Sequence, residues 1–122
     1  KNSDGTTQDE KITQHRKTPN SVLLSSSLWE GVDLKDEDSR FQIIAKVPYK
    51  SLGDKRVLEK MKKFQSWYDY ETMVRILQGF GRSIRSESDW AITYVIDSKI
   101  NDLIKRTRSD IPKAYWDVLK IS

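Results

Sequence analysis

The chain has 122 residues, of which 36% are hydrophobic and 33% charged, enough for the core of one domain but not of two. Its 22 basic and 18 acidic residues give a net charge of +4, a mild excess that is compatible with phosphate-bearing partners without proving one. The absence of cysteine excludes disulfides and thiolate metal sites within these residues. No apolar run approaches the roughly 18 residues of a membrane span, and the first residues form no signal-peptide core. We therefore expect a soluble, cytoplasmic protein with no membrane partner.

The N-terminal part of the chain predicts one short helix and one strand. Residues 1–6 are polar and include a glycine, so we expect a disordered segment there. Thr7 and Glu10 have the spacing of a capping box, which predicts a helix that stops before Pro19. The apolar run 21–25, bounded by polar residues, predicts a buried parallel strand.

The remainder of the chain alternates strands with helices. The expected elements are a strand over 41–47, a helix capped by Asp54, a helix over 70–85, a strand over 91–96, a helix from Ser98 that Pro112 breaks, and a short helix over 114–119. This alternation predicts an α/β fold, with a parallel sheet and helices on both of its faces. Three strands are few for such a sheet, so we expect one of its edges to be exposed.

The most informative segment begins at Gln78. Read as one continuous helix, Gln78, Arg82 and Arg85 fall at i, i+4 and i+7, within roughly 60° of one another around the axis. Gly79 and Gly81 flank this face, although each costs a helix roughly 1 kcal/mol against alanine. An amide that orients water and arginines that neutralise charge are what transfer of a nucleotide's terminal phosphate requires. The alternative that spacing alone leaves open is an amphipathic helix with a solvated basic face.

Three segments resemble the XPD/DinG group of superfamily-two DNA helicases in both order and spacing. Residues 78–89, with the pattern Gln-x-x-Gly-Arg-x-Ile-Arg-x-x-x-Asp, resemble motif VI of that group. Residues 25–34 resemble its motif V, and residues 44–54 resemble the segment Lys-Leu-Pro-Phe-x-Ser-x-x-Asp that lies between these motifs. The resemblance runs from about residue 8 to about residue 97. It implies that residues 7–122 are part of the second RecA-like lobe of a helicase, a truncated P-loop NTPase-like fold.

The resemblance also implies roles for individual residues. These roles are catalytic for Gln78, Arg82 and Arg85, nucleotide-binding for Glu30, Gly31 and Asp33, nucleic-acid-binding for Ser25, Ser26, Tyr49 and Lys50, and supporting for Gly81 and Asp89. The two arginines would act as arginine fingers, each worth roughly a thousandfold or more in phosphoryl transfer. Asp89 would pair with an arginine and hold its orientation. Local sequence alone leaves open an ordinary serine-rich loop with Asp33 as a turn residue.

No Gly-x-x-x-x-Gly-Lys-Ser/Thr pattern occurs in the sequence, nor an acidic box after a strand, so we expect the chain to supply only half of an ATP site. The resemblance implies an ATP-dependent DNA helicase that moves 5′ to 3′ on single-stranded DNA in repair or replication. ATP and Mg²⁺ would bind the intact enzyme, with Mg²⁺ held by an N-terminal RecA-like lobe of the same polypeptide and no metal site in this chain. The chain alone would be inactive. Two alternatives stay open: a catalytically inactive nucleic-acid-binding domain, and a protein-interaction module of the same fold.

Overall fold

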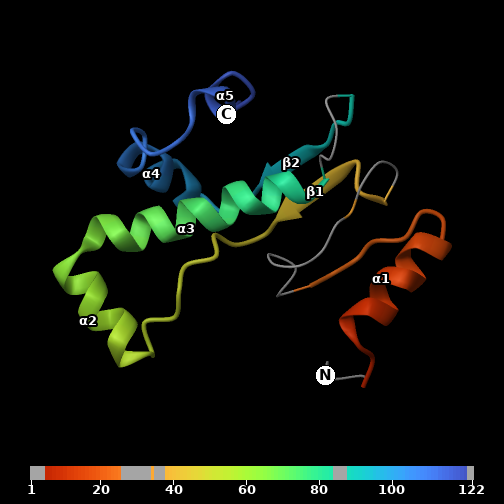
Figure 1. Ribbon diagram of the computed structural model, residues 1–122, viewed down its shortest axis with the longest axis horizontal. Coiled ribbons are helices and arrows are strands. Elements are labelled where there is room, and N and C mark those ends of the chain that lie inside the picture. Colours follow the sequence, from red (N-terminus) through yellow and green to blue (C-terminus); the bar gives the residue numbers. More distant parts are fainter. Residues whose placement is uncertain (1–4, 26–33, 35–37, 84–87, 121–122) are drawn as a thin grey trace.

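The computed structural model describes residues 5–25, 34, 38–83 and 88–120 (Figure 1). Its elements are α1 (Gln8–Lys17), β1 (Phe41–Ile44), α2 (Lys55–Lys63), α3 (Gln65–Phe80), the 3₁₀ turn η2 (Gly81–Ser83), β2 (Ile92–Val95), α4 (Lys99–Arg106) and α5 (Lys113–Trp116). A short parallel sheet with helices packed on it is the α/β architecture of a truncated RecA-like lobe, so the predicted fold class is confirmed. Residues 1–4 of the predicted disordered segment lie outside the described residues.

The sheet joins β1 and β2 in parallel, with Phe41 opposite Ile92 and Ile44 opposite Val95. One further bond, from the N–H of Ile96 to the carbonyl of Ile44 at 3.1 Å, extends the ladder past the end of β2. The strands predicted over 41–47 and 91–96 are therefore present, although both are shorter than expected. Helices α2 and α3 form the crossover between them, as parallel strands require.

The strand predicted over residues 21–25 is wrong. The segment is irregular, and Val22 and Leu24 are 73% and 84% exposed. An apolar run becomes a strand only where a neighbouring strand pairs with its backbone and covers its side chains. Among the described residues, β1 pairs with β2 alone, and the run 21–25 does not pair with the free edge of either strand.

The core lies on one face of the sheet, where α3 and α4 pack (Figure 1). Its buried side chains are Ile44, Val47, Met73, Ile76, Leu103, Ile104 and Ile111. Because side chains alternate along a strand, the intervening residues point to the opposite face. Those residues, each at least 48% exposed, are Phe41, Ile43, Ile92 and Tyr94. Among the described residues, helices thus cover one face of the strand pair, whereas the other face is apolar and exposed and lacks the helices predicted for it.

The local helix signals are confirmed at the first two helices. The Thr7 N–H donates to the Glu10 carboxylate at 2.8 Å and the Glu10 N–H donates to the Thr7 hydroxyl at 3.3 Å, which completes the capping box of α1. At the start of α2, the Asp54 carboxylate accepts the Arg56 N–H at 2.9 Å. Helix α5 is shorter than the helix predicted over 114–119, and α4 ends well before Pro112.

The helix predicted over 70–85 differs from α3 at both ends. Helix α3 begins at Gln65 and ends at Phe80, where the chain tightens into η2. The N–H of Gly81 donates to the carbonyls of both Leu77 and Gly79, so the regular helical bonding pattern ends here. Two glycines within three residues weaken the helix at this point, and 3₁₀ turns are frequent at helix C-termini. The face predicted to run unbroken from Gln78 to Arg85 is therefore interrupted after Phe80.

Candidate functional site

The segments that resemble motifs V and VI meet at a backbone hydrogen bond. The N–H of Leu34, the last residue of the segment 25–34, donates to the carbonyl of Arg82 in η2 at 3.1 Å. The Nε atom of Arg82 is shielded from solvent, and its side chain as a whole is half-buried. Two segments distant in the sequence are thus joined at the residue predicted to act as an arginine finger.

Gln78 and Arg82 flank the end of α3. Gln78 lies in the last turn of the helix and is exposed, whereas Arg82 follows in η2. Both residues therefore lie at the junction of α3 and η2 and not within the one continuous helix that was predicted. Arg85, the third catalytic residue of the prediction, lies outside the described residues.

Gly81 lies between Gln78 and Arg82 and has no conformational need to be glycine. Its backbone is in the ordinary right-handed helical region, with φ of −68° and ψ of −10°. A Cβ atom built on it would meet nothing within 4 Å among the described residues. An alanine would therefore fit, and it would restrict the unfolded chain more than glycine does. The backbone of Gly81 is therefore open on its Cβ side with respect to the described residues.

Ser25, Tyr49 and Arg82 line one open hollow between the segment 21–25 and β1. Gly79, which is buried at the end of α3, also lines this hollow. Ser25, predicted to contact DNA, and Arg82, predicted to contact nucleotide, therefore both border this broad hollow, whose lining extends from α1 to α4. The remaining predicted residues of motif V lie outside the described residues: Ser26, Glu30, Gly31 and Asp33.

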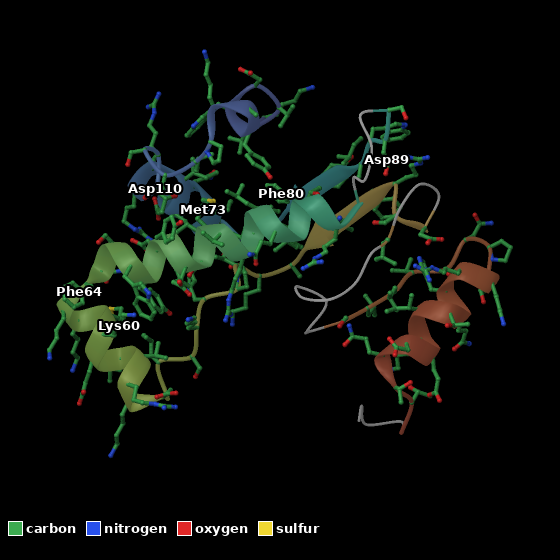
Figure 2. The ribbon with its side chains drawn as sticks, viewed as in Figure 1. Lys60, Phe64, Met73, Phe80, Asp89 and Asp110 are labelled. Carbon is green, nitrogen blue, oxygen red and sulfur yellow. The ribbon has the colours of Figure 1, made fainter. Side chains whose placement is uncertain are left out.

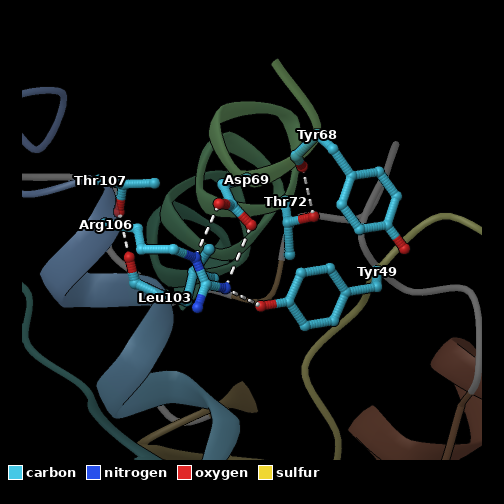
Figure 3. Close-up of polar contacts among 7 residues, drawn as sticks. All are labelled: Tyr49, Tyr68, Asp69, Thr72, Leu103, Arg106 and Thr107. Carbon is cyan, nitrogen blue, oxygen red and sulfur yellow. Dashed lines mark hydrogen bonds and ion pairs between the residues drawn. The ribbon is translucent and has the colours of Figure 1, made fainter. Parts of the chain in front are cut away.

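Tyr49 is held by contacts within the chain (Figure 3). Its ring stacks on that of Tyr68, with centroids 5.3 Å apart, and its hydroxyl accepts a hydrogen bond from Arg106 at 3.1 Å. Burial raises the pKa of the Tyr49 phenol, and the nearby Arg106 charge opposes this rise. Lys50, its neighbour, pairs with Glu71 at 2.9 Å. Both residues thus have protein partners, and their contact with DNA stays a prediction.

An ion pair that the sequence did not reveal joins α3 to α4. Arg106 donates to both carboxylate oxygens of Asp69, at 2.7 and 3.2 Å (Figure 3). The Asp69 side chain is 4% exposed and that of Arg106 is 47% exposed. The hydrogen bond to Asp69 raises the pKa of Arg106 above its usual value. Because Arg106 also contacts Tyr49, it fixes the turn after β1 against both helices.

Asp89 pairs with Arg40, which lies outside the segment that resembles motif VI, so its pairing with one of the proposed arginine fingers stays a prediction. The two side chains meet at 2.8 Å, and Asp89 also accepts the Trp90 N–H at 2.9 Å. Arg40 in turn donates to the Trp90 carbonyl at 3.1 Å and lies over the Trp90 ring. Since Arg40 precedes β1 and Asp89 precedes β2, this contact holds the entries of the two strands together.

The profile of the helicase C-terminal domain family matches residues 1–117. The chain belongs to this family. The regulator of telomere elongation helicase 1 homologs of Caenorhabditis briggsae and Drosophila ananassae are 30% and 29% identical to it in alignments 86 residues long, which cover 57% and 60% of the chain. Each alignment covers 9% of the relative, so the chain spans about a tenth of the length of these curated relatives. No solved structure matches the chain.

The family match confirms the resemblance to the C-terminal region of XPD/DinG-like superfamily-two helicases. Within the described part of this helicase C-terminal domain, no group of three or more His, Cys, Asp or Glu side chains could hold a metal ion. None of its described helices is long and apolar enough to cross a membrane.

Proposed function

We propose that this helicase C-terminal domain supplies the arginine half of the ATP site in an ATP-dependent DNA helicase. The observation that carries the proposal is the hydrogen bond from Leu34 to the Arg82 carbonyl. It brings the end of the segment resembling motif V to the arginine of the segment resembling motif VI. A helix that served only as a surface would have no need of this junction.

The residues at the junction fit the terminal phosphate of a nucleotide. Arg82 has a planar guanidinium that can neutralise charge on phosphate oxygens, and Gln78 has an exposed amide that can orient water. Gly81 leaves bare backbone between them, with space where a Cβ would stand. When bound, ATP supplies the phosphoryl group that is transferred to water. Arg85 is proposed as a second arginine of the same site, with Glu30, Gly31 and Asp33 along the nucleotide cleft.

The other half of the ATP site is proposed to lie in an N-terminal RecA-like lobe of the same polypeptide. That lobe would provide the phosphate-binding loop and hold Mg²⁺, because the sequence of this chain contains no such loop. Closing the two lobes would bring Arg82 to the phosphates. Alone, the 122 residues should therefore lack ATPase activity.

Single-stranded DNA is the proposed nucleic-acid substrate, with 5′ to 3′ movement in repair or replication. Ser25 lines the same hollow as Arg82, which would couple a phosphate contact on the strand to the nucleotide site. Ser26, Tyr49 and Lys50 are proposed to extend this contact. A conformational change where the two segments meet would then alter the binding of both the DNA strand and the nucleotide.

Strand-stimulated ATP hydrolysis by the intact polypeptide, compared with that of the 122-residue chain, tests the proposal. We expect stimulation by single-stranded DNA in the intact protein and no turnover by the chain alone. Robust hydrolysis by the chain alone would contradict the division of the ATP site between two lobes. Strand binding without hydrolysis in the intact protein would indicate the catalytically inactive nucleic-acid-binding domain instead.

A further inference from the structure

The net positive charge of the chain is concentrated in one short stretch. Residues 50–64 contain six of the 22 basic residues and two of the 18 acidic residues. The rest of the chain therefore contains 16 of each and is neutral overall. The whole excess of +4 resides in this stretch, which comprises the end of the turn after β1, helix α2 and its C-cap.

Helix α2 presents this charge to solvent. It contains no buried residue and packs against α3 at the end of the molecule away from the sheet (Figure 1). Its apolar residues Val57, Leu58 and Met61 are half-buried. Its exposed basic residues are Lys55, Arg56, Lys60, Lys62 and Lys63. Figure 2 shows Lys60 and Phe64 in this part of the molecule, with the α2 side chains extending outward.

Trp67, at the start of α3, brings two of the lysines together. The ammonium nitrogen of Lys60 lies 4.0 Å from the centroid of its ring, and that of Lys50 lies 5.0 Å away. A tryptophan face attracts cations, which offsets part of the repulsion between them. Lys50 is also neutralised by Glu71 at 2.9 Å. Trp67 therefore fixes the Lys60 ammonium group at the contact between α2 and α3.

Few carboxylates compensate the charge of α2. Asp54 contacts Arg56 at 3.4 Å. Among the described residues, no ion pair is recorded for Lys55, Lys60, Lys62 or Lys63. Exposed lysines this close together repel one another. A bound polyanion neutralises this repulsion, and its binding also releases counterions from the polyanion.

We propose that α2, with Lys60 held by Trp67, forms a binding surface for the phosphodiester backbone of a nucleic-acid strand. The ammonium groups act as point charges on phosphates, so the surface contributes affinity and salt dependence without reading sequence. This surface is separate from the hollow lined by Ser25 and Arg82. The inference rests on the proposed function for the identity of the strand, and it does not depend on ATP hydrolysis.

The test compares two triple variants of the intact polypeptide that remove equal charge. The α2 variant carries Lys60→Gln, Lys62→Gln and Lys63→Gln. The control variant changes exposed lysines elsewhere and carries Lys105→Gln, Lys113→Gln and Lys120→Gln. Binding of a labelled oligothymidylate is measured at several salt concentrations. If all three α2 lysines contact phosphates, the slope of log affinity against log salt should fall in magnitude by about 2, and affinity at about 0.1 M salt should fall about 100-fold. The control triple should keep the slope.

An unchanged slope in the α2 triple, or an equal change in the control triple, would overturn the inference. The first result would leave α2 as a solvated face or a site for an acidic protein, and the second would indicate an effect of net charge alone. ATP hydrolysis at saturating strand, measured on the same proteins, separates this inference from the proposed function. A shifted slope in a polypeptide without ATPase activity would support the surface and contradict the helicase proposal. Strand-stimulated ATP hydrolysis with an unshifted slope in the α2 triple would support the helicase proposal and contradict the α2 surface.

Discussion

Leu34 and Arg82 are joined through their backbones, with the Leu34 N–H donating to the Arg82 carbonyl at 3.1 Å. The bond uses the main chain of Arg82 and so fixes where η2 passes the segment 25–34. It does not itself fix the guanidinium group of Arg82. The position of the proposed arginine finger therefore depends on contacts that lie outside helix α3.

Gly81→Ala should separate stability from activity. Because Gly81 has helical dihedral angles and open space at its Cβ, alanine should stabilise the domain slightly, by about 0.4–1 kcal/mol. The added methyl would occupy the space proposed for the phosphate, so ATP hydrolysis by the intact polypeptide should fall. Thermal unfolding and steady-state ATPase assays measure the two effects. A variant that is stable and fully active would remove Gly81 from the proposed site.

Asp89→Asn should loosen the entries to both strands. Its side chain is 1% exposed and pairs with Arg40, so the change removes a buried charge partner and should cost about 1.5–3 kcal/mol locally. Asparagine can still accept the Trp90 N–H, which limits the loss. Hydrogen–deuterium exchange of peptides that cover β1 and β2 should be faster, while those covering α2 stay unchanged. Unaltered ATP hydrolysis in this variant would restrict Asp89 to a structural role.

Arg106→Leu should destabilise the domain more than Tyr49→Phe. The first change leaves the Asp69 carboxylate buried without its cation, at a cost of about 2–3 kcal/mol given that Arg106 is half exposed. The second removes one hydrogen bond, worth about 1 kcal/mol, and keeps the stacking on Tyr68. Hydrogen–deuterium exchange of the α3 and α4 amides in the intact polypeptide measures the destabilisation caused by each variant. Equal effects would mean that the Asp69–Arg106 pair contributes nothing beyond the tyrosine contact.

The stability of the domain should decline in acid partly through Asp97. Hydrogen bonds from the Val47 N–H at 2.9 Å and the Lys99 N–H at 3.1 Å hold the pKa of this carboxyl below its usual value. A lowered folded-state pKa contributes stability above the unfolded value of about 3.9, and this contribution is lost as pH falls through the folded pKa. Unfolding measured from about pH 6 downward should therefore show a shallower acid decline in Asp97→Asn than in the unmodified protein. Identical pH profiles would contradict this role.

Features that depend on nearby residues could be predicted from the sequence. The capping box of Thr7 and Glu10 and the cap at Asp54 each involve residues within three positions, and both are present. The apolar runs over 41–47 and 91–96 were also predicted to be strands. That prediction is confirmed because the two runs pair with each other as β1 and β2.

Features that depend on distant partners could not be predicted. The run 21–25 has the composition of a strand, and its composition cannot say whether another strand lies beside it. The pairs Asp69–Arg106 and Leu34–Arg82 join separate elements without any spacing pattern. The end of α3 at Phe80 did have a local signal in Gly79 and Gly81. That signal agrees with the change to η2, which the prediction of one helix over 70–85 missed.

The most direct test of the central claim compares Arg82→Ala with Arg75→Ala in the intact polypeptide. Both arginines are half-buried, but Arg75 lies within α3, about two turns before Arg82 in η2. With nucleotide binding measured in parallel, Arg82→Ala should lower the kcat of strand-stimulated ATP hydrolysis about a thousandfold while ATP still binds, and Arg75→Ala should change it little. Equal activity in the two variants would mean that Arg82 plays no part in phosphoryl transfer, and would contradict the assignment of this junction to the ATP site.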